Sequence, residues 1–87
     1  MKKTLIFYKP EYIDLAIKLR DNYRAHGHEV ADIVSVEEHD DIEYAEEMQC
    51  DEAVFIEESD IVTFHDIESG FTSRIPVSDM FYNDPKE

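Results

Sequence analysis

A short apolar run that leads directly into a long amphipathic pattern constrains the fold of this chain most. The run Leu5–Tyr8 is continuous, which is typical of a strand buried on both faces of a sheet. The helical pattern extends from Glu11 to Gly27, with Pro10 suited to its first turn and Gly27 to the position just after its last turn. Its apolar residues recur at helical spacing, namely Tyr12, Leu15, Ala16, Leu19 and Tyr23.

A second helix and two more strands are expected in the middle of the chain. Residues 28–34 alternate between polar and apolar side chains, which predicts a strand. Both Ser35-Val36-Glu37-Glu38 and Asp40-Asp41-Ile42-Glu43 fit a capping box. The later start of the second helix is preferred, because Ile42, Ala45 and Met48 then share one face. A further buried strand follows over residues 53–56.

The last third of the chain predicts a β-hairpin. Strand-like runs cover residues 61–66 and 71–75, and Gly70 between them supplies the positive φ that a hairpin loop needs. Ser78 is the expected cap of a terminal helical turn that continues through Tyr82. The complete order is β-α-β-α-β followed by a C-terminal hairpin. With right-handed crossovers it predicts an α/β fold, in which a mixed sheet with three parallel strands is flanked by helices.

Composition limits the class of protein. The 87 residues suit one domain spanning 1–87, and 43% apolar content is too high for a disordered chain despite the net charge of −14. No apolar run has the length of a membrane span. The single cysteine, Cys50, has no partner for an internal disulfide, so a reducing cytoplasm is the expected location.

Charge is distributed very unevenly along the chain. No Lys or Arg lies between Arg24 and Arg74, whereas that stretch holds sixteen Asp and Glu residues. Binding to RNA needs clustered Lys and Arg, because the release of counterions from phosphates drives it. The sequence therefore disfavours nucleic acids and anionic membranes as partners.

Cofactor motifs are missing from the sequence. The chain has only two glycines, so it contains neither a phosphate-binding P-loop nor a dinucleotide fingerprint. The turn after the first strand is Lys9-Pro10-Glu11, in which proline removes a backbone donor and glutamate adds a negative charge. No cofactor is expected.

Metal-binding and catalytic patterns are equally weak. The four histidines, His26, His28, His39 and His65, lie near carboxylates but do not follow a metal-ligand spacing. Cys50 follows the apolar face of the second helix, where a buried small side chain is the common role. We therefore predict no metal ligands and no catalytic residues.

Scattered residues nevertheless resemble one known family. In the first helix and the strand after it, these are Ala16, Leu19-Arg20, Gly27 and Val30; later they are Tyr44-Ala45 before the strand 53–56, then residues 62–70, and Arg74-Ile75-Pro76-Val77. Together they resemble the C-terminal, anticodon-binding-type domain of histidyl-tRNA synthetases. The same domain occurs in the regulatory subunit of ATP phosphoribosyltransferase, in histidine biosynthesis. The resemblance implies a mixed sheet flanked by helices.

Departures from that family bear on function. Synthetases of this type usually carry Lys or Gln around the second helix, where this chain has Asp40, Asp41, Glu43, Glu46 and Glu47. The resemblance therefore implies a non-catalytic domain of the regulatory-subunit type, either free-standing or part of a longer chain. Its partner would be the catalytic subunit of ATP phosphoribosyltransferase or an upstream catalytic-like domain.

Two alternatives remain open, and they differ in the partner they predict. One is a tRNA anticodon-binding domain of a histidyl-tRNA synthetase, and the other is a stand-alone acidic protein-interaction domain. The candidate partner contact is the apolar patch Met80, Phe81 and Tyr82, which would otherwise serve as a lid on the core.

Overall fold

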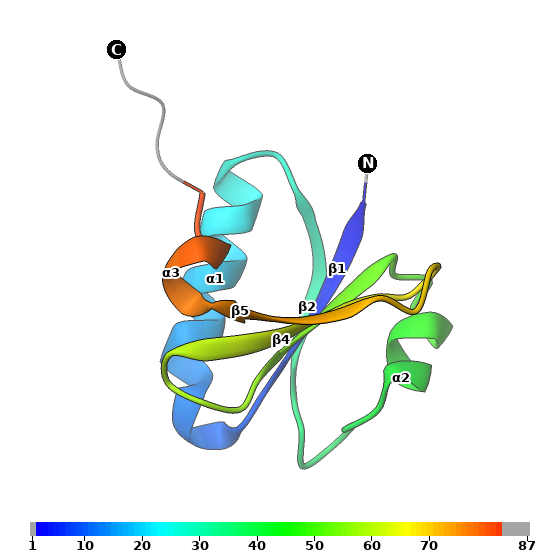
Figure 1. Cartoon of the computed structure of the whole chain (residues 1–87), viewed down its shortest axis with the longest axis horizontal. Helices are drawn as coiled ribbons and strands as arrows, with labels where there is room; N and C mark the ends of the chain where they lie inside the picture. Colours follow the sequence, from blue (N-terminus) through cyan, green and yellow to red (C-terminus); the bar gives the residue numbers. More distant parts are fainter. Residues whose placement is uncertain (1, 83–87) are drawn as a thin grey trace.

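The computed structural model describes residues 2–82 as a five-stranded sheet with helices on its faces (Figure 1). The strands are β1 (Lys3–Tyr8), β2 (Glu29–Ser35), β3 (Glu52–Ile56), β4 (Ile61–Asp66) and β5 (Thr72–Pro76). The helices are the 3₁₀ turn η1 (Pro10–Tyr12), α1 (Ile13–Ala25), α2 (Ile42–Glu47) and α3 (Val77–Met80).

The sheet is mixed, with strand order β2-β1-β3-β4-β5. Strands β2 and β3 both run parallel to β1, whereas β4 is antiparallel to β3 and β5 is antiparallel to β4. The predicted α/β class, the three parallel strands and the C-terminal hairpin are therefore confirmed. Strand β1 lies in the centre, which explains why its residues Thr4–Phe7 are all buried.

One face of the sheet is covered by α1, with α3 beside it (Figure 1). From α1, Ala16, Leu19 and Tyr23 are at most 5% exposed and pack with Ile6 and other inward-facing strand residues. The helix thus buries the stripe that the sequence pattern predicted.

The opposite face is covered by α2 (Figure 1). Ala45 of α2 and the following Cys50 pack with Leu5, Phe7 and Ala53 of the sheet. The burial of Cys50, at 6% exposure, confirms its predicted role as a small core side chain.

Backbone geometry explains where both main helices end. After α1, Gly27 has φ +84°, the amide of His28 donates to the carbonyl of Tyr23, and that of Gly27 donates to Arg24. This is a Schellman arrangement, and it confirms Gly27 in its predicted position. After α2 the same pair of bonds forms around Gln49, which has φ +61°.

Two predicted helix caps need correction. The late start of α2 is confirmed, but the capping side chain is Asp41 rather than Asp40: its Oδ1 accepts from the amide of Glu43 at 3.1 Å. Ser78 does not cap α3, because it lies inside that helix and the N-cap position belongs to Pro76. The helix also ends at Met80 and does not continue through Tyr82 as predicted. Val77 already makes a backbone bond to the carbonyl of Asp60, which sets the earlier start.

Candidate functional site

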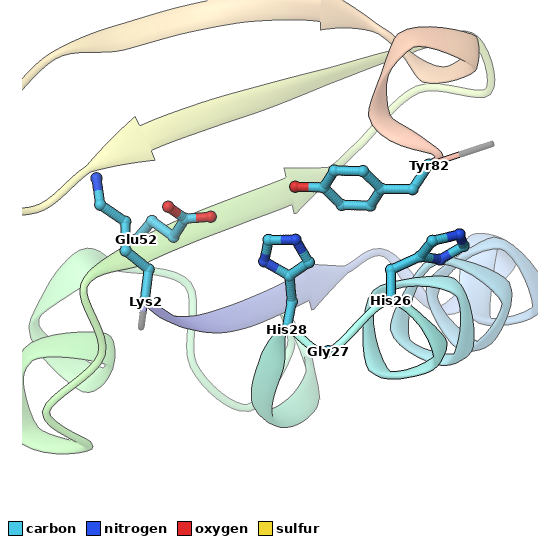
Figure 2. A pocket seen from close by; sticks show the side chains of 6 residues that line it. All are labelled: Lys2, His26, Gly27, His28, Glu52 and Tyr82. Atoms are coloured by element: carbon cyan, nitrogen blue, oxygen red, sulfur yellow. The ribbon is translucent and has the colours of Figure 1, made fainter. Parts of the chain in front are cut away.

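A pocket of about 430 Å³ opens at the amino ends of the parallel strands (Figure 2). Its lining comes from separate parts of the chain: Lys2, His26, Gly27, His28, Glu52 and Tyr82. Lys2 precedes β1, His28 precedes β2 and Glu52 begins β3, so the sheet topology itself brings these residues together.

The opposite edge of the sheet, where parallel strands end, is closed by backbone bonds. Ligands in α/β folds usually bind outside these carboxyl ends. Here the amide of Lys9 donates to Ile56 at 3.0 Å and that of Val36 donates to Tyr8 at 2.9 Å. Pro10 has no amide to offer to a phosphate.

Aromatic rings form one wall of the pocket. Tyr82 stacks on His28, with ring centroids 4.5 Å apart and ring planes at 11°. Its ring also lies near His26 and Tyr23, at centroid distances of 5.6 and 5.3 Å. Tyr82 is therefore the centre of a four-ring cluster at the end of α1.

Asn22 of α1 fixes Tyr82 in that position. Its side-chain amide donates to the carbonyl of Tyr82 at 2.9 Å and accepts from the amide of Tyr82 at 2.7 Å. The backbone carbonyl of Asn22 lies 2.8 Å from Nδ1 of His26. One residue thus places two of the pocket's rings, although the Tyr82 side chain stays 42% exposed.

Charged groups form the other wall. The half-buried Glu52 carboxylate accepts from the hydroxyl of Thr4 at 3.0 Å through Oε2, and Thr4 is only 2% exposed. Lys2 lies with its ammonium 3.6 Å from Asp66. Glu52 and Asp66 are direct neighbours across the β3–β4 pair, so two carboxylates face the same region.

The hydroxyl of Tyr23 belongs to this oxygen-rich region. Burial raises the pKa of Tyr23 well above its ordinary value, and repulsion from Tyr82 and Glu52 raises that pKa further. Hydrogen bonds from Ser69, with a smaller effect of Lys2, lower the pKa of Asp66, which therefore carries its negative charge at neutral pH. The region gathers several acceptor oxygens beside the ammonium group of Lys2.

The predicted contact patch divides between the core and the pocket. Met80 is 7% exposed and belongs to the core below α1, and Phe81 packs partly buried against the same cluster. Tyr82 alone presents a large exposed surface, and it faces the pocket (Figure 2). Whether these residues contact a partner stays a prediction.

The histidines separate into three places. His26 and His28 share the pocket, whereas His39 stacks on Tyr44 and His65 bonds to the hydroxyl of Thr72. Within residues 2–82, no three His, Cys, Asp or Glu side chains converge as a metal-ligand set.

The pocket was not predicted from the sequence. The pair His26 and His28 around a turn glycine was the one visible signal, because the end of α1 and the start of β2 must lie beside the start of β1. No pattern in the sequence indicated that Tyr82 lies beside these two histidines.

Comparison with known proteins leaves the family open. No protein-family profile matches the chain, and no curated protein matches it significantly. In the part of the chain that the structure describes, no helix has the length and apolar character to cross a membrane.

Proposed function

We propose that this chain is a non-catalytic protein-interaction domain, of the type found in the regulatory subunit of ATP phosphoribosyltransferase. In this role it holds a protein partner in the cytoplasm and regulates or positions an enzyme of histidine synthesis. The observation that carries the proposal is the charge layout: the second helix is acidic where the synthetases that the sequence resembles usually carry Lys or Gln.

The positions of the basic side chains support a protein rather than an RNA partner. Lys3 donates to the carbonyl of Met48 at 2.9 Å, and Arg24 donates to that of Val30 at 3.0 Å. Lys2, Arg20 and Arg74 pair with Asp66, Asp21 and Glu58. Basic groups that bind within the domain contribute less to a phosphate-binding surface, which depends on unneutralised positive charge.

The surface of α2 favours a second candidate, a stand-alone acidic domain that recognises a basic protein. The carboxylates in and before this helix are all exposed: Asp40, Asp41, Glu43, Glu46 and Glu47. Such a surface steers a positively charged partner toward it and accelerates association at low salt.

The first experiment is capture of partners by the tagged domain from its native cytoplasm at low salt, with the eluate analysed for protein and RNA. Recovery of the catalytic subunit of ATP phosphoribosyltransferase without RNA is the expected result. Recovery of tRNA with a steep dependence on salt would overturn the proposal in favour of the anticodon-binding alternative.

Variants then separate the regulatory domain from the acidic one. The triple change Glu43→Gln, Glu46→Gln and Glu47→Gln removes exposed charge from α2 without touching the core. We expect it to leave binding to the catalytic subunit nearly unchanged, whereas Tyr82→Ala weakens that binding. Abolition of binding by the triple variant, with Tyr82→Ala harmless, would instead assign the acidic surface as the contact.

A further inference from the structure

The lining of the pocket at the end of α1 contains the carboxylate of Glu52, which is not paired with the ammonium group of Lys2 in the same lining. Lys2 is paired with Asp66, but Glu52 receives its hydrogen bond from the neutral hydroxyl of Thr4. Among residues 2–82 no ion pair to Glu52 is formed. Because Glu52 also lies opposite Asp66, a cation in the pocket would relieve the repulsion between like charges on adjacent strands.

Two further features of the pocket favour a cation. His26 and Gly27, which directly follow the last turn of α1, line the pocket, and the carboxyl end of a helix carries partial negative charge. The ring of Tyr82 is stacked on His28, so its hydroxyl is the group that it directs toward Glu52, and this oxygen can accept a hydrogen bond from a cation (Figure 2). The net charge of −14 adds an attractive field over the whole molecule.

We propose that this pocket binds a primary alkylammonium group, with its charge held between the carboxylate of Glu52 and the hydroxyl of Tyr82. Figure 2 shows both groups facing the open space of the pocket. The site shares Tyr82 with the partner contact proposed above, but a free amine is enough to occupy it, so the two proposals can fail separately.

The hydrogen bonding of Glu52 selects an ammonium group over a guanidinium. Oε2 already accepts from Thr4, so the carboxylate cannot offer both oxygens freely to a planar fork. An ammonium group needs only the remaining oxygen and the phenol. Phosphate-bearing ligands are disfavoured, because Glu52 and Asp66 lie on this face of the sheet.

A lysine side chain of a partner protein and a free polyamine carry the same chemistry. The test is therefore a titration of the ¹⁵N-labelled chain with Nα-acetyl-lysine methylamide and, separately, with spermidine. Nα,Nε-diacetyl-lysine methylamide, which lacks the charge, is the control ligand. We expect saturable shifts at residues 26–28, 52 and 82 with the amines and none with the control.

Two variants that each remove one carboxylate charge locate the site. Glu52→Gln retains an acceptor for Thr4 and removes the charge, so it is expected to weaken binding about tenfold. Glu46→Gln removes the same charge from the exposed surface of α2 and is expected to leave affinity nearly unchanged. Tyr82→Phe, which retains the ring, tests the contribution of the hydroxyl and is expected to weaken binding less than Glu52→Gln.

The outcomes distinguish the source of the amine from the failure of the proposal. Saturation by the lysine derivative supports a protein side chain as the natural ligand, and saturation by spermidine alone supports a free polyamine. Shifts spread over α2, with Glu46→Gln as damaging as Glu52→Gln, would show diffuse attraction to the acidic surface and overturn the proposal. Binding of inorganic phosphate in the pocket would overturn it as well.

Discussion

The two faces of the sheet are stabilised in different ways. On one face, the thirteen-residue α1 inserts Leu19 and Tyr23 between strand side chains. On the other face, α2 has six residues and only Ala45 among them is fully buried. There the strands themselves supply the bulk, because Phe7 and Phe55 stack with centroids 4.4 Å apart.

This difference indicates that the two faces of the sheet have different roles. A helix that buries large side chains contributes stability through packing, whereas a short helix with mostly exposed carboxylates contributes little apolar burial. The α1 face therefore supports the fold, and the α2 face presents charge to the solvent. The pocket lies on the α1 face, where its residues rest on the better-packed half of the molecule.

The largest expected effect on stability comes from the removal of a large side chain of α1. Leu19 is 1% exposed, so Leu19→Ala is expected to cost about 3 kcal/mol of unfolding free energy through lost burial and a residual cavity. The matched change on α2 is Ile42→Ala at a half-buried position, expected to cost about 1 kcal/mol. Urea unfolding followed by circular dichroism measures both.

Equal costs for the two variants would contradict the proposed division between the faces. A change in the denaturant slope for Leu19→Ala would have to be checked first, since the comparison assumes two-state unfolding. Phe55→Leu offers a further control, because it removes the ring stack from the α2 face without changing either helix.

A smaller effect is expected at the two helix ends, which share one geometry but differ in residue. Gly27→Ala is expected to cost about 1 kcal/mol: its φ of +84° is unfavourable for a side chain, although nothing lies within 4 Å of the added carbon. Gln49→Gly at φ +61° is expected to be neutral or to stabilise by under about 1 kcal/mol. Thermal unfolding of both variants provides the measurement.

Changes in stability of opposite sign for Gly27→Ala and Gln49→Gly would show that backbone strain dominates both helix ends. If Gln49→Gly instead destabilised the protein as much as Gly27→Ala, the Gln49 side chain would have to make a contribution larger than the strain it causes. Gln49 is exposed, which is why we expect the first result.

The predictability of the fold followed the strength of local patterns. The apolar run Leu5–Tyr8 and the stripe of α1 have strong periodicities, and both elements formed where they were expected. The starts of α2 and α3 were less certain, because adjacent Asp40 and Asp41 both suit a cap and because the backbone bond of Val77 comes from a distant loop. Long-range contacts of this kind leave no local signal.

The candidate site was much less predictable than the fold. Glu52 and Asp66 are neighbours only through the pairing of β3 with β4, and Tyr82 reaches the pocket only because Asn22 binds its backbone. Residues 22 and 82 are far apart in the sequence, and an asparagine in a helix is ordinarily a solvent-facing residue. Sequence periodicity reports which side chains are buried, but it does not report which polar groups meet.

The smallest expected effect lies in the β4–β5 turn, beyond the reach of both helices. Asp66 accepts from the amide and the hydroxyl of Ser69, at 3.2 and 2.6 Å, and these bonds lower its pKa from the ordinary value of 3.8. A lowered pKa in the folded state means that the stabilisation is complete above pH 3.8 and is lost as the pH falls through the folded value.

Thermal unfolding of the parent chain and of Asp66→Asn between pH 2 and pH 6 is expected to show this dependence. The parent should be slightly more stable near pH 6, and the difference should shrink below the ordinary pKa as Asp66 gains a proton. Asp60→Asn is the matched control, because Asp60 is exposed and accepts a hydrogen bond from Val77 through its backbone carbonyl, which the substitution leaves in place. A difference that persisted unchanged to the lowest pH would mean that the carboxylate charge does not stabilise this turn.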